Sequence, residues 1–329
     1  MDITYLLWLQ NLRLSLGKGT ENFFSFITDI PFNPLTVLLI CTIYWCLEKR
    51  LGLFILFSQS IGTFVNNIIK NCVCAYRPWI RDRRINPPPR AQAGATGYSF
   101  PSGHTQAVVG EFGTLGYALC RKDMEQKNHR WLWAVILCAA VILIVAFSRN
   151  FLSVHTPQDV LVALCVGALF VWISDLILRW EARGTEGKKR DVLIVFFGTV
   201  IIASASAFVL LKNYPVNYIN GNIVVDPADM KNDFFGGAGS FCAVLWGWLI
   251  EKRWIKFSTE CSAGLKILRG LAGALGVAII FVLTSLLLKP AMHSLYAYYF
   301  IKYFMLYIWV TAAYPAVFSI IHKKIRKDE

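Results

Sequence analysis

Three short clusters between residues 70 and 159 gather the residue types that bind and cleave phosphate. Cleavage of a phosphate ester requires cations around the non-bridging oxygens, a nucleophile, and an acid for the leaving oxygen. The clusters are KNCVCAYRP, with Lys70 and Arg77; PSGH, with Ser102, Gly103 and His104; and SRNFLSVHTPQD, with Ser148, Arg149, His155 and Asp159. They supply cations, imidazoles, hydroxyl groups and a carboxylate. We therefore expect these clusters to form a phosphate site.

The first cluster predicts part of a cationic cradle. Lys70 and Arg77 are seven residues apart, which is two helical turns, so a continuous helix would present both on one side. Arg149, from another segment, would complete the cradle. Arginine suits this role because its planar fork donates two parallel hydrogen bonds to phosphate. Lys70 taken alone could instead be a lysine that reaches from an apolar helix to the membrane surface.

The second cluster, PSGH, lies where a polar loop turns into an apolar segment. Pro101 fits the first turn of a helix, and Gly103 allows close backbone approach. Exposed N–H groups and the helix dipole at such a terminus attract anions, and the Ser102 hydroxyl adds a donor. We expect His104 on the first turn of this helix, facing the same anion.

The third cluster holds a histidine and a carboxylate four residues apart. His155 and Asp159 would meet on one helical face if a helix starts near Thr156. A carboxylate that accepts from one imidazole nitrogen fixes the tautomer and leaves the other nitrogen nucleophilic. The same pair taken alone could simply stabilise a helix.

Taken in order, K-x6-RP, PSGH and SR-x5-H-x3-D resemble the three-part signature of the type 2 phosphatidate phosphatase superfamily. That superfamily also includes glucose-6-phosphatases, sphingoid-phosphate phosphatases and vanadium haloperoxidases. The resemblance covers roughly residues 51 to 180. The C-terminal third lies outside the signature, and only its layout is similar to the longer, glucose-6-phosphatase-like members.

The resemblance implies a role for each signature residue. His155 would attack phosphorus to form a phosphohistidine, Asp159 would orient His155, and His104 would protonate the leaving oxygen. Water would then hydrolyse the intermediate, with no metal or cofactor taking part. The residues implied to bind phosphate are Lys70, Arg77, Ser102, Gly103 and Arg149.

Three further polar residues are candidate accessory residues. Glu111 lies seven residues beyond His104, on the same face of an apolar helix, and carboxylates inside membrane segments are candidates for function. It could tune the site or pair with a neighbouring segment. Asn66 precedes Lys70 by one turn and could orient it, and Ser148 lies beside Arg149.

Composition predicts an integral membrane protein. The 329 residues are 56% hydrophobic and 16% charged, whereas soluble domains carry about 25% charged residues. The net charge of +13 could suggest a nucleic-acid partner, but the cations lie mainly in short loops between apolar segments, so we expect none. Nine scattered cysteines show neither a disulfide framework nor metal-ligand spacing.

The apolar segments predict an all-α, polytopic helix bundle with about nine spans. We divide the chain into an interfacial amphipathic segment (1–32, with helices at 3–15 and 22–28), a phosphatase core (33–180) and additional transmembrane helices (181–329). The expected spans are 33–47, 51–74, 101–120, 131–148, 157–178, 191–212, 235–254, 265–288 and 294–321.

Lysine and arginine are concentrated in alternate loops, which predicts those loops to be cytoplasmic and all three clusters to be extracytoplasmic. Between them, a polar loop carries Arg81, Arg83, Arg84 and Arg90. This loop is either simply solvated or a cationic collar that attracts an anionic head group.

A site at the bilayer edge suits a lipid phosphate as substrate, because the tail can remain in the membrane. A polyprenyl diphosphate, phosphatidate, phosphatidylglycerol phosphate or sphingoid phosphate would fit. The alternatives are a sugar phosphate, phosphoryl transfer to another acceptor, and a non-enzymatic lipid scramblase or carrier. The presence of His104, His155 and Asp159 together argues against a scramblase or carrier. A bacterial cytoplasmic membrane is the preferred location, with the endoplasmic reticulum as the alternative, and the oligomeric state is left unassigned.

Overall fold

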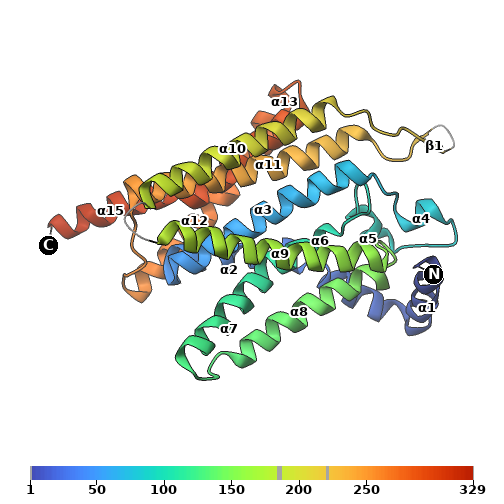
Figure 1. The fold of residues 1–329 in the computed structure, drawn as a ribbon, viewed down its shortest axis with the longest axis horizontal. Helices are drawn as coiled ribbons and strands as arrows, with labels where there is room; N and C mark the ends of the chain where they lie inside the picture. Colours follow the sequence, from blue (N-terminus) through green and yellow to red (C-terminus); the bar gives the residue numbers. More distant parts are fainter. Residues whose placement is uncertain (1, 184–186, 220–221, 329) are drawn as a thin grey trace. The chain divides into compact units, whose positions relative to one another are not determined.

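The computed structural model describes residues 2–183, 187–219 and 222–328, and these form helices almost throughout (Figure 1). The predicted all-α class is confirmed. The elements of the first half are α1 (Asp2–Ile27), η1 (Ile30–Phe32), α2 (Pro34–Thr42), η2 (Ile43–Leu47), α3 (Lys49–Val73), α4 (Pro78–Arg81), α5 (Pro89–Ala93), α6 (Gly103–Val108), η3 (Val109–Gly113), α7 (Thr114–Gln126) and α8 (Leu132–Phe151).

The second half continues in the same way, apart from one short antiparallel hairpin in which Tyr218 pairs with Ile223. Its elements are α9 (Pro157–Ala182), α10 (Gly187–Leu211), β1 (Tyr218–Ile219), β2 (Asn222–Ile223), α11 (Pro227–Ile250), η4 (Glu251–Ile255), α12 (Ala263–Leu283), η5 (Thr284–Leu288), α13 (Lys289–Ala291), α14 (Leu295–Ile308), η6 (Trp309–Ala313) and α15 (Tyr314–Asp328).

Seven helical segments among the described residues are long and apolar enough to cross a membrane. They are Lys49–Arg81, Leu132–Phe151, Pro157–Ala182, Lys189–Leu211, Pro227–Ile255, Ala263–Ala291 and Leu295–Ile321. The other two predicted spans are also helical. Pro34–Leu47 is shorter, and the helix from Gly103 carries His104, Gln106 and Glu111, whose polarity lowers its hydropathy. About nine spans is therefore roughly consistent with the structure, and the chain is a multi-pass membrane protein.

The N-terminal segment consists of two helical stretches joined at a kink, in agreement with the two helices that the sequence predicts. α1 runs from Asp2 to Ile27 and bends at Gly17, whose φ of 81° lies in the region that favours glycine. The bend falls in the gap between the predicted helices at 3–15 and 22–28. Interfacial placement of this segment stays a prediction.

The chain divides into two compact units, each built from several stretches of sequence. The first unit comprises Met1–Asn33, Gly62–Trp172 and Leu211–Lys231, and the second comprises Pro34–Ile61, Ile173–Leu210 and Asn232–Glu329. The division into 1–32, 33–180 and 181–329 follows the signature instead of packing, and it stays a prediction. All the predicted site residues belong to the first unit.

In the first unit, α1 and α7 both pack along α8 (Figure 1). The ring of Phe24 on α1 lies 4.4 Å from that of Phe151 at the end of α8. Gly116 lets α7 approach α8 closely, because an added Cβ would lie 3.2 Å from Cβ of Cys138. The contact of Phe24 with Phe151 holds the C-terminal end of α8, which carries Arg149.

The second unit has a core in which polar aromatic groups reach main-chain acceptors. Nε1 of Trp45 donates to the carbonyl of Val310 at 2.8 Å, and Oη of Tyr314 donates to the carbonyl of Arg269 at 2.6 Å. Arg269 in turn donates to the carbonyl of Trp45 at 3.0 Å. Such bonds satisfy groups for which a membrane interior offers no water.

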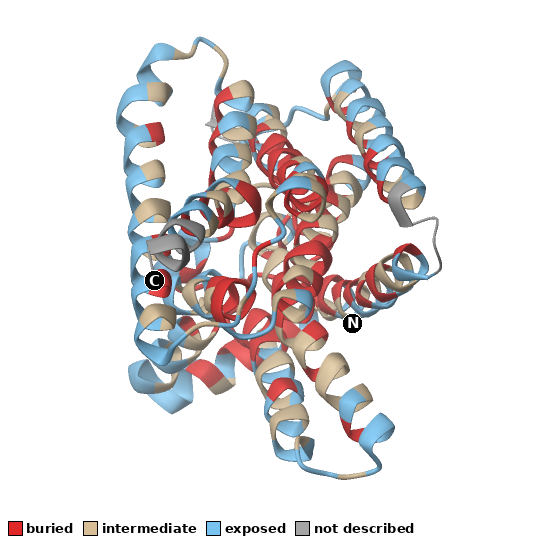
Figure 2. Cartoon of the chain, turned by 90° about the vertical axis from the view of Figure 1, so that its left-hand side faces the viewer, coloured by how far each residue is buried: buried red, intermediate tan, exposed pale blue. Residues whose placement is uncertain are grey.

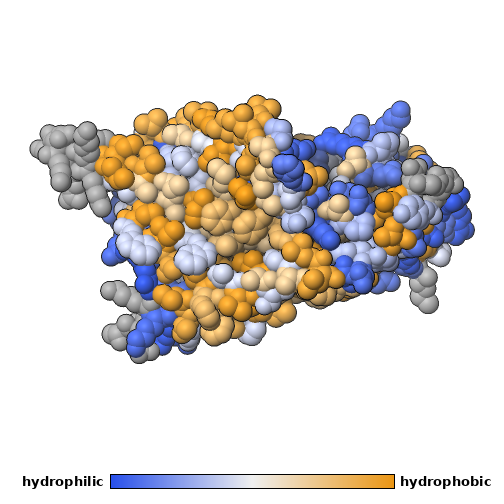
Figure 3. Space-filling view, turned by 90° about the horizontal axis from the view of Figure 1, so that it is seen from above, coloured by the Kyte–Doolittle hydropathy of each residue, from blue (hydrophilic) through white to orange (hydrophobic). Residues whose placement is uncertain are grey.

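Exposed and buried residues alternate along individual helices (Figure 2). Many of the exposed side chains are large and apolar, which is unusual for a soluble protein but expected where lipid surrounds the helices. Hydrophobic residues accordingly dominate much of the face seen in Figure 3. Examples from α8 and α12 are Trp133, Ile136, Leu137, Leu143, Ile267, Leu268, Leu271 and Leu275.

Candidate active site

The backbone between Lys70 and Arg77 leaves the helix, so the two residues are not on one continuous helix as predicted. α3 ends at Val73, and Cys74 has a φ of 53°. Arg77 is extended, with ψ 153°, because it precedes Pro78. The two cations are therefore presented by different backbone segments.

The Arg77 side chain contacts three main-chain carbonyls and His155. Nε donates to the carbonyl of Gly97 at 3.1 Å and Nη2 to that of Thr96 at 2.7 Å. Nη1 donates to the carbonyl of Val154 at 3.1 Å and lies 2.7 Å from Nε2 of His155. Three main-chain carbonyls and His155 thus hold the guanidinium beside the imidazole, where an anion that approached Nε2 of His155 would meet its positive charge.

The contact with Arg77 defines the tautomer of His155. A guanidinium only donates, so Nε2 must accept and the ring proton sits on Nδ1. Nδ1 lies 3.4 Å from Oδ2 of Asp159 and 3.3 Å from Oγ of Ser99. Burial, and then the charge of Arg77, hold the pKa of His155 well below its usual range. The neutral ring thus keeps its lone pair on Nε2.

The carboxylate of Asp159 is fixed by the start of α9. The helix begins at Pro157, close to the predicted position, and Thr156 caps it: the Thr156 N–H donates to Oδ2 of Asp159 at 2.8 Å, and the Asp159 N–H donates to Oγ1 of Thr156 at 3.3 Å. His155 lies before this cap. The prediction that the pair shares a helical face is therefore wrong, although the two side chains do meet.

The PSGH cluster starts a helix, as expected, but two residues later than predicted. Ser102 is the N-cap of α6, and its Oγ accepts from Oγ1 of Thr105 at 2.9 Å. Pro101 therefore precedes the helix instead of lying in its first turn. The Ser102 N–H donates to the carbonyl of Asp159 at 3.0 Å, which ties this terminus to the start of α9.

Gly103 lies beside the side chains of Lys70 and Asn66. A Cβ at Gly103 would lie 3.7 Å from Nζ of Lys70 and 3.9 Å from Oδ1 of Asn66. Both of these side chains are buried. The structure therefore brings Lys70, Asn66 and Gly103 together, as the proposed orienting role of Asn66 requires.

His104 occupies the first turn of α6, as predicted. Its ring lies edge-on to Phe32, with the two centroids 4.8 Å apart. The side chain is half-buried. Phe32 thus limits the positions open to the imidazole.

Arg149 is a fully buried cation in the last turn of α8, with 1% of its surface exposed. Nη1 donates to Oγ1 of Thr28 at 2.5 Å, while Nε and Nη2 have no hydrogen-bond partner among the described residues. Burying charged N–H groups that have no hydrogen-bond partner is costly. A bound anion would remove that cost.

The accessory candidates differ in position. Asn66 lies at Gly103, as described above. Glu111 is buried in the π-helical turn η3, which changes the helical register after His104. The Ser148 hydroxyl donates to the carbonyl of Val145 at 2.6 Å, one turn back along its own helix.

Several residues at the site were not identified from the sequence. Ser99 donates to Oδ2 of Asp159 at 2.6 Å, and Arg13 on α1 donates to the carbonyl of Phe151 at 3.1 Å. Met230 accepts from the N–H of Tyr98 at 3.3 Å, beside the segment that holds Arg77. Of these, only Ser99 lies close to the signature in the sequence, three residues before Ser102, so only Ser99 could have been considered from the sequence.

The predicted cationic collar is largely paired. Arg81 contacts Asp2 and Arg90 contacts Asp29, each at 2.8 Å, and Arg84 contacts Asp82 at 2.7 Å. These exposed pairs reduce the positive field that the loop can offer to a head group. No group of three or more histidine, cysteine or acidic residues in the described parts of the chain is placed to hold a metal ion.

The helices and the site together define a class: a multi-pass membrane protein in which a histidine–carboxylate pair adjoins buried cations. A profile of the PAP2 superfamily matches residues 51–183, and a profile of the PAP2 superfamily phosphatase transmembrane extension matches residues 235–326. The chain belongs to the PAP2 superfamily.

Curated relatives include lipid and sugar phosphatases. The chain is 27% identical to an undecaprenyl-diphosphatase of Sulfolobus acidocaldarius, over 44% of this chain and 62% of the relative. It is 29% identical to lipid phosphate phosphatase delta of Arabidopsis thaliana, over 47% and 38% respectively. It is 23% identical to a glucose-6-phosphatase catalytic subunit of Haplochromis nubilus, over 63% and 62%. Each match spans less than two thirds of the relative, and no solved structure matches the chain significantly.

Proposed function

We propose that this protein is a phosphatase that hydrolyses the phosphate monoester or diphosphate of a membrane lipid through a phosphohistidine. The observation that carries the proposal is the position of His155: Nε2 lies 2.7 Å from Nη1 of Arg77, while Nδ1 faces Asp159 at 3.4 Å. A neutral histidine with a fixed tautomer beside a fixed cation suits attack on phosphorus.

The proposed first step forms one bond and breaks another. The Nε2 lone pair of His155 attacks phosphorus, and the bond to the leaving oxygen breaks as His104 donates a proton to that oxygen. Arg77, Arg149 and Lys70 neutralise the non-bridging oxygens. Asp159 stabilises the positive charge that develops on the His155 ring.

The second step regenerates the enzyme. Water attacks the phosphohistidine, its proton passes to His104, and the phosphorus–nitrogen bond breaks to release inorganic phosphate. Transfer to another acceptor would follow the same course with an alcohol in place of water. None of these steps requires a metal ion, so we propose that the reaction is metal-independent.

A lipid substrate is supported by the membrane setting and by the relatives. The helices expose large apolar side chains, as expected in a bilayer. Relatives named for lipid substrates include the undecaprenyl-diphosphatase and a dolichyldiphosphatase of Saccharomyces cerevisiae. The loop distribution of lysine and arginine supports an extracytoplasmic site, and we place the protein in a bacterial cytoplasmic membrane.

A sugar phosphate is the second candidate. The glucose-6-phosphatase match covers 63% of this chain, more than either of the lipid phosphatase matches given above. The length of this match favours a similar arrangement of helices outside the signature. The substrate must therefore be decided by direct comparison.

The test is phosphate release by detergent-purified protein in EDTA. The panel comprises undecaprenyl diphosphate, phosphatidate, sphingosine phosphate and glucose 6-phosphate. Wild type is compared with His155→Ala and with a matched control, His129→Ala, which alters an exposed histidine in the α7–α8 loop. We expect release from a lipid in EDTA, retained by the control and lost in His155→Ala.

Other outcomes separate the alternatives. Release from glucose 6-phosphate alone would replace the lipid proposal with the sugar-phosphate one. Folded protein that releases no phosphate, but transfers the phosphoryl group to an added alcohol, would indicate a phosphotransferase. Lipid movement between leaflets that is unchanged in His155→Ala, without any phosphate chemistry, would favour a scramblase or carrier.

A further inference from the structure

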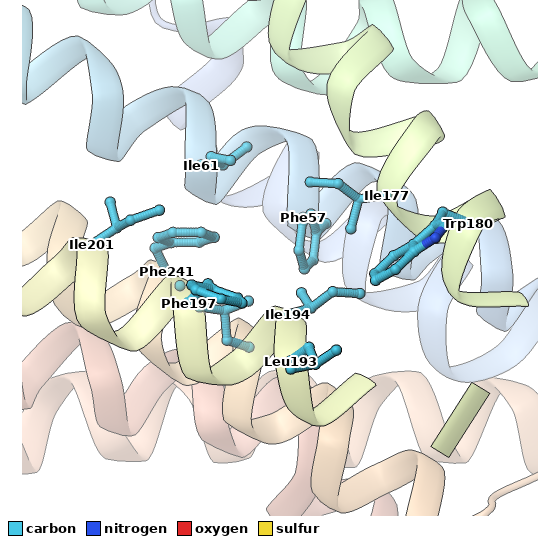
Figure 4. Close-up of a pocket in the computed structure, with 11 residues that line it drawn as sticks. Phe57, Ile61, Ile177, Trp180, Leu193, Ile194, Phe197, Ile201 and Phe241 are labelled. Atoms are coloured by element: carbon cyan, nitrogen blue, oxygen red, sulfur yellow. The ribbon is translucent and has the colours of Figure 1, made fainter. Parts of the chain in front are cut away.

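An apolar pocket of about 280 Å³ lies in the second unit, between α3, α9, α10 and α11 (Figure 4). Phe57 and Ile61 come from α3, and Phe241 and Leu245 from α11. The remaining lining residues are Ile177, Trp180, Leu193, Ile194, Phe197, Gly198 and Ile201, from α9 and α10. None is a residue of the proposed catalytic site.

The lining suits a hydrocarbon chain. Its side chains are aliphatic or aromatic, and a polar ligand would lose hydrogen bonds to water without replacing them. The pocket reaches the outside of the helices, because Trp180, Leu193, Phe197 and Ile201 are each between 44% and 57% exposed. In a membrane these residues face lipid acyl chains, so an acyl chain can enter directly.

A cation marks one end of this pocket. Arg190 precedes Leu193 and Ile194 by three and four residues, so it lies on the same face of α10. Its guanidinium is 5.3 Å from the ring of Trp180, and Nη1 donates to the Trp180 carbonyl at 2.8 Å. A second bond reaches the carbonyl of Arg183.

Three cations of α9 and η4 have carboxylate partners. Arg179 pairs with Asp175, Lys252 with Glu181, and Arg253 with Asp191. The partners of Arg190 are two neutral carbonyls and an aromatic ring, and among the residues that the structure describes no carboxylate pairs with it. A single anion at this end of the pocket would be complementary to it.

We propose that this pocket binds an anionic glycerophospholipid, with part of one acyl chain in the pocket and the phosphate at Arg190. The segment around Arg190 belongs to the loops predicted to be cytoplasmic. Anionic lipids attract basic residues at that surface, and basic pockets between transmembrane helices bind acidic head groups. The site would hold a structural lipid and is independent of the proposed phosphatase activity.

The test measures lipid retention by native mass spectrometry. Delipidated full-length protein receives phosphatidylglycerol or phosphatidylcholine with identical acyl chains. Arg190→Gln removes the cation, and its matched control is Arg130→Gln, which alters another arginine that lies over a tryptophan, Trp131. Ile194→Trp fills the pocket, and its matched control is Val192→Trp on an exposed position of α10 outside the lining.

We expect wild type to retain phosphatidylglycerol in preference to phosphatidylcholine. Arg190→Gln should weaken phosphatidylglycerol binding about fivefold, which corresponds to about 1 kcal/mol per cation near an anionic lipid surface. Ile194→Trp should lose both lipids, and both controls should behave as wild type. If Ile194→Trp fails to fold, Ile201→Trp tests the same pocket.

Three results would overturn the proposal. The first is equal retention of the two lipids by wild type, and the second is unchanged phosphatidylglycerol preference in Arg190→Gln. The third is unchanged retention in a folded pocket-filling variant. Lipid retention does not depend on catalysis, so loss of the proposed phosphatase activity would not alter any of these results.

Discussion

Nη1 of Arg77 lies 2.7 Å from Nε2 of His155, so a guanidinium that can only donate faces the nitrogen proposed to attack phosphorus. This contact requires the ring proton to be on Nδ1, where Asp159 and Ser99 can accept it. It also places a cation where the non-bridging oxygens of a phosphate would lie. The contact therefore accounts for both the tautomer of the proposed nucleophile and the binding of its target.

Arg77→Lys should reduce kcat/KM although it keeps the charge. A lysine cannot donate in parallel to the carbonyls of Gly97, Thr96 and Val154, so its position beside His155 would be lost. We expect a decrease of about 100-fold or more, the usual cost of losing one preorganised stabilising donor. Phosphate release measures it, with Arg81→Lys as the control. Activity within twofold of wild type would contradict the role given to the guanidinium fork.

Ser99→Ala should weaken the positioning of Asp159. The lost hydrogen bond is 2.6 Å long, and its acceptor is a carboxylate. We expect kcat to fall about tenfold, because hydrogen bonds to charged groups are among the stronger ones. Thermal unfolding separates positioning from damage to the fold, because Ser99→Ala should stay folded at the assay temperature while its kcat for phosphate release falls. Ser206→Ala, which removes a hydroxyl bonded within α10, is the control. An unchanged kcat, or a variant that is unfolded at the assay temperature, would argue against positioning.

The acid limb of the pH–rate profile should lie below the ordinary histidine range. The pKa of His155 is lowered by burial and by Arg77, so the attacking nitrogen stays unprotonated until the pH falls through that lowered value. The same group should make folding less stable as pH falls below about 6.5, since the unfolded chain then binds a proton that the folded chain does not. An acid limb of kcat/KM at or above pH 6.5 would refute this.

Gly97→Ala should disturb the clamp on Arg77. Gly97 has a φ of 62°, and a Cβ there would collide with Sδ of Met230. We expect a loss of at least about 1–2 kcal/mol in stability from the backbone alone, together with reduced activity. Gly94→Ala is the matched control, because its Cβ would meet only ordinary contacts at 3.7 and 3.9 Å. Thermal unfolding and phosphate release would be compared, and similar behaviour of the two variants would count against the clamp.

Arg149→Met should stabilise the ligand-free protein while abolishing its response to anions. Removing a buried charge whose Nε and Nη2 have no hydrogen-bond partner in the described parts of the chain should raise stability by about 1 kcal/mol or more. Inorganic phosphate at about 100 times its Kd would stabilise wild type by about 2.7 kcal/mol. The variant should show no such shift in Tm. A normal phosphate-induced shift in Arg149→Met would remove Arg149 from the proposed site.

The sequence by itself determined the helical class, the positions of the spans and the residues of the signature. Hydropathy suffices for the spans because a bilayer requires about 20 apolar residues in a helix. The start of α9 near Thr156 and of α6 at the PSGH cluster could also be predicted, because capping depends on neighbouring residues. All of these predictions depend only on residues that are close together in the sequence.

Only the tertiary structure decided how the signature residues meet. Arg77 reaches His155 from a segment that has left α3, and His155 meets Asp159 across a helix cap instead of along a helical face. Thr28 reaches Arg149 from a segment 121 residues away in sequence. Contacts of this kind depend on how helices pack, and local periodicity carries no information about them. The composition of the site is thus a property of the sequence, whereas its geometry is a property of the packed helices.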